Sequence, residues 1–274
     1  MIVKIAKNAG TCFGVDNAIK IAFRAAKSNG NVYIMGELVH NPYVVEKLRN
    51  SGVKQIDDIS ELNDGDSLII RAHGESKEVY EHCKKHGISV IDCTCPFVKK
   101  AQNIAVQLEE EGYRVIIIGD PEHPEVRGIV AQTKNAKVIH TPQDVDKEKV
   151  KFGKLGILSQ TTQTIENFSE TVAKIVSHPK IIKIYNTICT ATEERQRAAK
   201  ALSEEVELMI VIGGKNSANT KKLYELCRQR VKTKWVADET EIERQWFEKI
   251  NSVGITAGAS TPKEVIEKVR KNIT

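Results

Sequence analysis

The feature that most constrains this chain is a spacing of 24 residues that occurs three times. In each copy a cysteine precedes a segment with helical periodicity, and an apolar, strand-like run then ends in a glycine. The pairs are Cys12 and Gly36, Cys95 and Gly119, and Cys189 and Gly213. A fixed period of this kind is the sequence signature of an internal structural repeat. The chain is therefore expected to contain three copies of one unit.

The repeat continues beyond each glycine in the same order of elements. A polar residue lies four positions on, a second helix-like segment and a short strand-like run follow, and a last strand ends on another polar residue. The first polar set is His40, His123 and Ser217, and the second is His73, Thr161 and Ser260. Strands that alternate with helices predict an α/β fold with mostly parallel sheets.

We expect three similar α/β units in a pseudo-threefold arrangement around a central cavity. The expected boundaries are 13–94 for the first unit, 95–188 for the second and 189–274 for the third, which includes a C-terminal tail. Residues 1–12 are expected to supply the first strand of the first unit, together with Cys12. In open α/β sheets, ligands bind outside the carboxyl ends of the strands, where the nine cysteine and polar positions fall. Tandem units with three separate sites remain an alternative.

Composition and charge exclude several classes of protein. With 41% apolar and 28% charged residues the chain has the composition of a soluble globular protein. Its 41 basic and 36 acidic residues are too balanced to indicate nucleic-acid binding, although the net charge of +5 favours anionic ligands. The first ten residues contain no long apolar stretch, so we predict a cytoplasmic protein without a signal peptide or membrane contact.

Cysteine usage points to a metal site. In a reducing compartment, six cysteines are more often thiols or metal ligands than disulfides. Thiolates select iron–sulfur clusters, zinc or copper(I), and a 4Fe–4S cluster held by three cysteines keeps one iron open for a substrate. Cys83 and Cys227 are out of register and are expected to be buried. The register also selects Cys95 over its neighbour Cys93, which alternation places on the same side.

Two other patterns suggest rival sites. His82 and His86 flank Cys83 in a lysine-rich helical stretch and could hold zinc, but no Cys-x-x-Cys pattern completes that site. GGKNSANTKKL, residues 213–223, lacks the upstream glycine of a P-loop. It could still bind a phosphate at a helix N-terminus, or it could serve only as a helix cap.

Nine ordered motifs carry a family resemblance across essentially the whole chain. They are GTCFGVDNAI, LVHNPYVV, RAHG, DCTCPFV, HPEVRG, SQTT, TICTAT, KNSANT and TAGAS. Together they resemble the 4-hydroxy-3-methylbut-2-enyl diphosphate reductases, which catalyse the last step of the non-mevalonate isoprenoid pathway. The resemblance implies a 4Fe–4S cluster held by Cys12, Cys95 and Cys189. Its open iron would bind the substrate hydroxyl, which two electrons and protons remove as water to give isopentenyl and dimethylallyl diphosphate.

The same resemblance assigns roles to further residues. Glu125 matches the carboxylate that relays protons, and Thr161, with Gln160 nearby, matches the hydroxyl that orients the substrate oxygen. His123 is expected to take part in catalysis as well. The residues that match diphosphate-binding groups are His40, His73, His123, Ser217, Asn219 and Ser260. An external electron donor of the ferredoxin or flavodoxin type is implied.

Three positions depart from the family pattern. Phe13 and Cys93 stand where small residues are common, and Ala218 replaces a serine. Two functions of other classes remain open at this point. One is a non-catalytic metal or redox sensor that uses Cys93 and Cys95 as a thiol switch, and the other is a zinc hydrolase with the same three thiolates.

Overall fold

The computed structural model describes residues 1–27, 30–145, 153–176 and 180–274. Within these residues the strands form three four-stranded sheets, and every strand pair in them is parallel. Helices connect the strands, as parallel pairing requires. The predicted α/β class, with three similar sets of elements, is confirmed.

The three sheets share one strand order. In sheet A it is β11 (Lys232–Val236), β10 (Leu208–Ile212), β12 (Ser252–Ala257) and β1 (Ile2–Ile5). Sheet B has β3 (Lys54–Ile56), β2 (Val32–Met35), β4 (Ser67–Ile70) and β5 (Ser89–Asp92). Sheet C has β7 (Lys137–Ile139), β6 (Arg114–Ile118), β8 (Lys154–Ser159) and β9 (Ile181–Ile184). The strand that ends at the repeat glycine is always an inner strand.

Helices also repeat in threes. The first set begins directly after the cysteines and contains α1 (Phe13–Ala25), α4 (Pro96–Glu110) and α7 (Thr190–Ser203). The second set is α2 (Pro42–Asn50), α5 (Pro124–Val130) and α8 (Ala218–Arg228). A third set, which the repeat pattern did not include, precedes the edge strands or ends the chain: α3 (Lys77–Lys85), α6 (Ile165–Ile175) and α9 (Lys263–Ile273). Short 3₁₀ turns lie at Ile59–Glu61, Pro142–Asp144, Glu239–Glu241 and Arg244–Phe247.

The N-terminal strand departs from the prediction. β1 pairs with β12, with Val3 opposite Val253, and so completes sheet A. The expectation that residues 1–12 supply the first strand of the unit that follows them is therefore wrong. In each sheet one of the two edge strands, β1, β5 or β9, leads into a cysteine of the repeat. β1 therefore belongs to the last copy, just as β5 belongs to the first. A local sequence pattern cannot reveal this, because it does not specify the partner of a strand.

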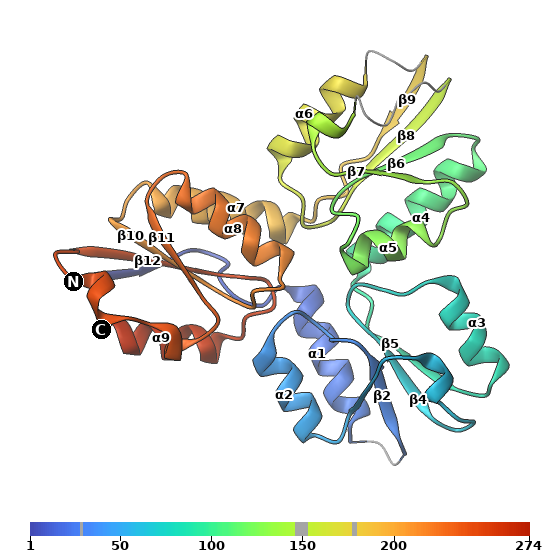
Figure 1. Cartoon of the computed structure of the whole chain (residues 1–274), viewed down its shortest axis with the longest axis horizontal. Helices are drawn as coiled ribbons and strands as arrows, with labels where there is room; N and C mark the ends of the chain where they lie inside the picture. Colours follow the sequence, from blue (N-terminus) through green and yellow to red (C-terminus); the bar gives the residue numbers. More distant parts are fainter. Residues whose placement is uncertain (28–29, 146–152, 177–179) are drawn as a thin grey trace. The chain divides into compact units, whose positions relative to one another are not determined.

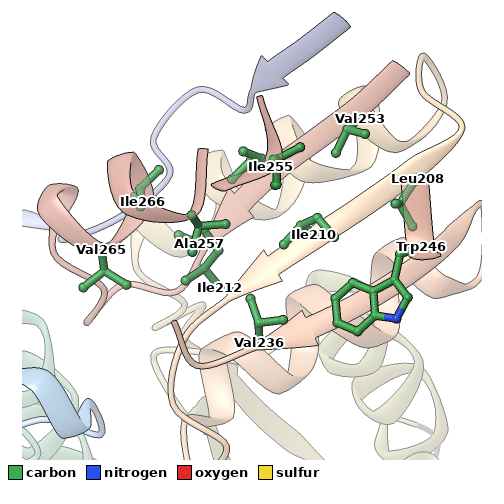
Figure 2. Packing of buried hydrophobic residues seen from close by; sticks show 12 residues of the cluster. Leu208, Ile210, Ile212, Val236, Trp246, Val253, Ile255, Ala257, Val265 and Ile266 are labelled. Carbon is green, nitrogen blue, oxygen red and sulfur yellow. The ribbon is translucent and has the colours of Figure 1, made fainter. Parts of the chain in front are cut away.

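Both faces of sheet A are covered. Leu208, Ile210 and Ile212 of β10 point to the core beneath α9, where Val265 and Ile266 pack against them (Figure 2). Met209 and Val211 belong to a second cluster with residues of α7 and α8. These two helices lie on the side of sheet A away from α9 (Figure 1). Side chains alternate along a strand, so a continuous apolar run such as LMIVI fits a strand buried on both faces.

The chain divides into two compact units. Unit 1 comprises Met1–Asp16, Val39–Glu46 and Thr190–Thr274 and contains sheet A. Unit 2 comprises Asn17–Leu38 and Lys47–Cys189 and contains sheets B and C. The predicted boundaries at residues 13, 95 and 189 stay predictions. In the described residues, no helix has the length and apolar character needed to cross a membrane.

Candidate active site

Each of the three cysteines in register is fixed by the same backbone hydrogen bond. Its N–H donates to the carbonyl two residues beyond the end of the neighbouring inner strand. The pairs are Cys12 with Ala259 at 3.2 Å, Cys95 with Ala72 at 3.0 Å and Cys189 with Thr161 at 3.0 Å. A helix begins at the next residue in every case. The partial positive charge of a helix N-terminus favours the thiolate form of a cysteine placed there.

Exposure separates these cysteines from the other three. Cys12, Cys95 and Cys189 are partly exposed, whereas the remaining thiols are buried. Cys83 and Cys227 lie in hydrophobic cores, as predicted, and burial raises the pKa of Cys227 to about 12. Three thiols are therefore accessible to a metal, and all three are the ones in register.

Cys93 is a poor candidate for a thiol switch. Its side chain is 2% exposed, and burial, followed by the charge of Asp92, raises the pKa of its thiol to about 12. Thiol exchange requires the thiolate, which a buried thiol with a raised pKa does not provide near neutral pH. The zinc alternative at His82 and His86 is also poorly supported, because Cys83 points into the core of sheet B.

Two short hydrogen bonds join Glu125 and Thr161. Glu125 lies on α5 and is 2% exposed. Its Oε1 accepts a hydrogen bond from the Thr161 N–H at 2.6 Å, and its Oε2 accepts one from Thr161 Oγ1 at 2.7 Å. Both contacts have the short length of charge-assisted hydrogen bonds. The carboxylate is thus held in one orientation before any ligand arrives.

Thr161 also joins this pair to a cysteine. Its carbonyl accepts the hydrogen bond from the Cys189 N–H, so Glu125, Thr161 and Cys189 form one hydrogen-bonded series within unit 2. By this contact Thr161 corresponds to Ala72 and Ala259 in the other copies. It lies one residue earlier than the positions of His73 and Ser260, with which the sequence pattern had aligned it.

Two predicted histidines meet in unit 2. The ring centroids of His73 and His123 lie 5.3 Å apart in an edge-to-face arrangement. His123 caps α5, and its Nδ1 accepts a hydrogen bond from the Glu125 N–H at 3.2 Å. An imidazole nitrogen that accepts is unprotonated, so the hydrogen of the neutral ring is assigned to Nε2. His123 therefore offers a donor at Nε2.

The Gln160 amide has hydrogen-bond partners within the protein. It is fully buried, its Oε1 accepts from the Asp120 N–H at 3.1 Å, and its Nε2 donates to Thr162 Oγ1 at 2.9 Å. A Cβ added at Gly119 would lie 3.0 Å from the Gln160 Cβ, so only glycine permits this close packing. The amide thus joins the turn before α5 to the turn after β8, and its geometry favours support of Glu125 and Thr161 over substrate contact.

Unit 1 contains a buried amide that its surroundings do not use. Ser217 caps α8, and its Oγ accepts from the Thr220 N–H at 3.3 Å. Asn219, on the first turn of α8, is 5% exposed, and neither its Oδ1 nor its Nδ2 has a hydrogen-bond partner among the residues that the structure describes. Buried amides are nearly always hydrogen-bonded, so an amide without a partner indicates a ligand position.

The remaining predicted residues of unit 1 are joined through their backbones. Ser260 Oγ donates to the His40 carbonyl at 3.1 Å. A Cβ added at Gly214 would lie 2.6 Å from the same carbonyl oxygen, so the turn after β10 can approach His40 only because this residue is glycine. His40 is thereby fixed beside the turn that leads into Ser217.

The predicted site residues therefore fall into two groups, one in each unit. We call those of unit 1 the Asn219 group: Cys12, His40, Ser217, Asn219 and Ser260. Those of unit 2 form the Glu125 group: His73, Cys95, His123, Glu125, Gln160, Thr161 and Cys189.

Comparison with known proteins decides the family. A family model described as LytB protein matches residues 3–274. The chain belongs to the LytB family. The resemblance drawn from the nine motifs is thereby confirmed.

Curated relatives and solved structures of LytB proteins agree with this assignment. A protein from Geobacter metallireducens, named 4-hydroxy-3-methylbut-2-enyl diphosphate reductase, is 44% identical over 99% of this chain and 98% of its own length. A protein of the same name from Citrifermentans bemidjiense is 42% identical over 100% and 97%.

Two solved structures are similar as well. A structure described as (E)-4-hydroxy-3-methyl-but-2-enyl diphosphate reductase, the terminal enzyme of the non-mevalonate pathway, has a TM-score of 0.72 and 40% identity, with 100% of this chain and 99% of that chain covered. A reductase from Plasmodium falciparum has a TM-score of 0.93 and 30% identity, with 98% and 87% covered.

The three departures from the LytB pattern have distinct surroundings. Phe13, the first residue of α1, is 74% exposed. Ala218 is the first residue of α8 and leaves the cap to Ser217. Cys93 donates its N–H to the carbonyl of Ile70, at the end of β4, and so continues the pairing of the edge strand toward Cys95.

Sequence reasoning missed Thr187 in this LytB chain. Its buried Oγ1 accepts from the Ser159 N–H at 2.8 Å and donates to the Ser159 carbonyl. It thereby fastens the segment before Cys189 to the end of β8. Its register position could have indicated this role, because it lies two residues before a cysteine, as Cys93 does.

Proposed function

We propose that this chain is a 4-hydroxy-3-methylbut-2-enyl diphosphate reductase. Family membership supports the proposal, and so do the names of relatives that match the chain over nearly their whole length. The observation that carries it is the hydrogen-bonded series of Glu125, Thr161 and Cys189. It joins a buried carboxylate, a hydroxyl and a candidate cluster ligand in one unit, which a reductive dehydration requires.

The cysteines fit an iron–sulfur cofactor. Three partly exposed thiols, each at the start of a helix, provide soft ligands, and the other three thiols are buried. In the proposal, Cys12, Cys95 and Cys189 hold a 4Fe–4S cluster with one open iron. When bound, this group supplies the two electrons and a position for the substrate hydroxyl. A ferredoxin- or flavodoxin-type donor is expected to deliver the electrons.

The reaction balances with two electrons and two protons. The allylic carbon–oxygen bond breaks, and the oxygen leaves as water after it gains a proton. The allyl fragment gains two electrons and the second proton, which gives isopentenyl or dimethylallyl diphosphate. In the proposal, Thr161 Oγ1 orients the substrate oxygen and Glu125 relays the proton. The carboxylate first takes up a proton and then passes it on through the Thr161 hydroxyl. His123 Nε2 provides a further hydrogen-bond donor.

The Asn219 amide is a proposed contact of the diphosphate, because it is buried without a partner within the described part of the chain. The other proposed contacts are the hydroxyls of Ser217 and Ser260 and the imidazoles of His40, His73 and His123. Ser260 would exchange its contact with the His40 carbonyl for the diphosphate. Binding the diphosphate supplies energy remote from the reacting bond, which fixes the allylic carbon. That residues of both groups contact a single substrate is a prediction from the sequence, as is the cytoplasmic location.

Anaerobic purification tests the proposal. The wild-type protein should be brown, contain about four irons per chain and reduce the substrate with a reduced viologen dye. Cys95→Ser should lose most of the iron and the activity. Cys93→Ala is the matched control two residues away and should keep both. A colourless zinc protein, or iron loss in the Cys93 variant alone, would overturn the assignment.

A further inference from the structure

The segment before each candidate ligand is held to the rest of the protein at the residue two positions before the cysteine. These residues are Gly10, Cys93 and Thr187. Cys93 is a buried side chain, and Thr187 is held by its hydroxyl, as described above. Gly10 has no side chain, and its carbonyl instead accepts a hydrogen bond from Arg195 Nη2 at 2.7 Å. In the segment before Cys12, the side chain that holds the backbone therefore comes from a distant residue, Arg195.

Arg195 lies on α7, the helix that begins directly after Cys189. It is 2% exposed and is one of the largest fully buried side chains in the described ranges. Its Nη1 donates to the Ala191 carbonyl at 3.0 Å, in the first turn of the same helix. One guanidinium thus holds the backbone before Cys12 to the start of the helix that follows Cys189. All of these atoms belong to unit 1.

A residue with a side chain would not fit easily at Gly10. Its φ of +98° lies in the region that side chains disfavour. A Cβ there would lie 2.9 Å from Ile266 Cδ1 and 3.1 Å from the Thr261 carbonyl oxygen. The loop is thus pressed against α9 on one side and held by Arg195 through its carbonyl. Its N–H contact with the Ala257 carbonyl is longer, at 3.4 Å.

The choice of arginine fits this task. Burying a charged side chain is unfavourable unless its donors are used. A planar guanidinium presents several donors in a fixed fork and can reach two carbonyls at once, whereas a lysine ammonium is a single point on a flexible stem. A residue needed only for the stability of a helix could be apolar at this buried place.

We propose that Arg195 is a positioning residue for Cys12. By holding Gly10 against α7 it keeps the Cys12 thiol in the orientation that retains the metal, and this inference rests on the proposed iron–sulfur function. Arg195→Met should release the Cys12 segment and leave the Cys95 and Cys189 segments unchanged. Arg195→Lys should give an intermediate result, because one of the two contacts can be kept.

Site-resolved alkylation of the full chain, purified without iron, tests the proposal independently of activity. In Arg195→Met, Cys12 should react at least roughly fivefold faster than in the wild type, because a buried charge-assisted hydrogen bond no longer restrains its loop. The rates at Cys95, Cys189 and the buried Cys227 should stay unchanged. Arg197→Met is the control, since Arg197 is exposed on the same helix.

The iron-loaded protein gives a second readout. Iron loss to a chelator under anaerobic conditions should be several-fold faster in Arg195→Met than in Arg197→Met, with Arg195→Lys between them. Equal Cys12 rates in the Arg195 and Arg197 variants would overturn the inference. An increase at all six cysteines together would also overturn it, because this would indicate general destabilisation. If Arg195→Met does not fold, Arg195→Lys provides the same comparison. A wild type without iron would contradict the proposed function but leave the alkylation result intact.

Discussion

The two groups of polar residues differ in whether a key buried side chain already has hydrogen-bond partners within the protein. In the Glu125 group the carboxylate already has two short hydrogen bonds, both to Thr161. In the Asn219 group a buried amide has no partner in the described residues. A carboxylate that moves a proton must be oriented before the reaction, whereas a ligand-binding donor is most effective when no internal contact competes for it. The difference fits the proposed roles of Glu125, which acts on the reacting bond, and of Asn219, which holds the diphosphate.

Replacement of the carboxylate should have the largest effect. In Glu125→Gln the amide can still accept from the Thr161 N–H and donate to its hydroxyl, so the fold and substrate binding should persist. Proton delivery is lost, and kcat should fall by roughly 10²- to 10⁴-fold with little change in KM. Steady-state kinetics would measure this. Glu122→Gln, a change at an exposed carboxylate three residues earlier and before α5, is the control. Near-normal turnover in the Glu125 variant would contradict the assignment of proton delivery to Glu125.

Removal of one of the two hydrogen bonds between Glu125 and Thr161 should have an intermediate effect on turnover. Thr161→Val keeps the backbone contact with Glu125 but deletes the hydroxyl contact. The free energy of unfolding should fall by about 1.5–3 kcal/mol, since a buried charged group loses a donor. Turnover should fall by roughly tenfold as the carboxylate gains freedom.

Thr171→Val is a matched control for this change. Thr171 is also buried, but its Oγ1 donates to the neutral carbonyl of Asn167 at 2.7 Å. Its replacement should lower the free energy of unfolding by about 1 kcal/mol and leave turnover unchanged. Equal losses of stability at the two threonines, measured by denaturant unfolding, would remove the basis for calling the Glu125 pair charge-assisted.

The smallest effect on the folded protein is expected at Asn219. Asn219→Ala should raise KM by roughly tenfold and change the free energy of unfolding by less than about 1 kcal/mol, because no internal hydrogen bond is lost. Its neighbour Ser217 gives the contrast: Ser217→Ala removes a helix cap and should lower stability by about 1 kcal/mol. Denaturant unfolding and KM would be measured for both variants. A large stability loss in Asn219→Ala without a change in KM would show that the amide is structural.

Much of the fold followed from the repeat. In each sheet, one inner strand (β2, β6 or β10) is mostly apolar and buried and is followed directly by the repeat glycine, so the positions of these strands in the chain carry a strong local signal. The selection of Cys95 over Cys93 also agrees with the difference in their exposure. These features depend on neighbours in the chain, which is the information that a sequence pattern contains.

Features that depend on partners distant in the chain could not be read in this way. The alignment of Thr161 with His73 and Ser260 was one residue off, because the loops differ in length and only the hydrogen bond of the following cysteine fixes the register. The contacts of the Gln160 amide with Asp120 and Thr162 likewise had no sequence signal, and its predicted substrate contact stays a prediction. No sequence pattern indicated the role of Arg195, since its hydrogen-bond partner Gly10 lies 185 positions away in the chain.

Completion of sheet A by β1 has a consequence for how the chain folds. Sheets B and C are built from strands close together in the chain, so each can form as soon as its own segment has been synthesised. Sheet A pairs Ile5 with Ile255, which closes a loop that spans nearly the whole polypeptide. Closure of so long a loop is entropically unfavourable and slow. β1 is thus synthesised long before its partner β12, and its exposed Ile2 and Ile5 stay unpaired until the last copy of the repeat has been made.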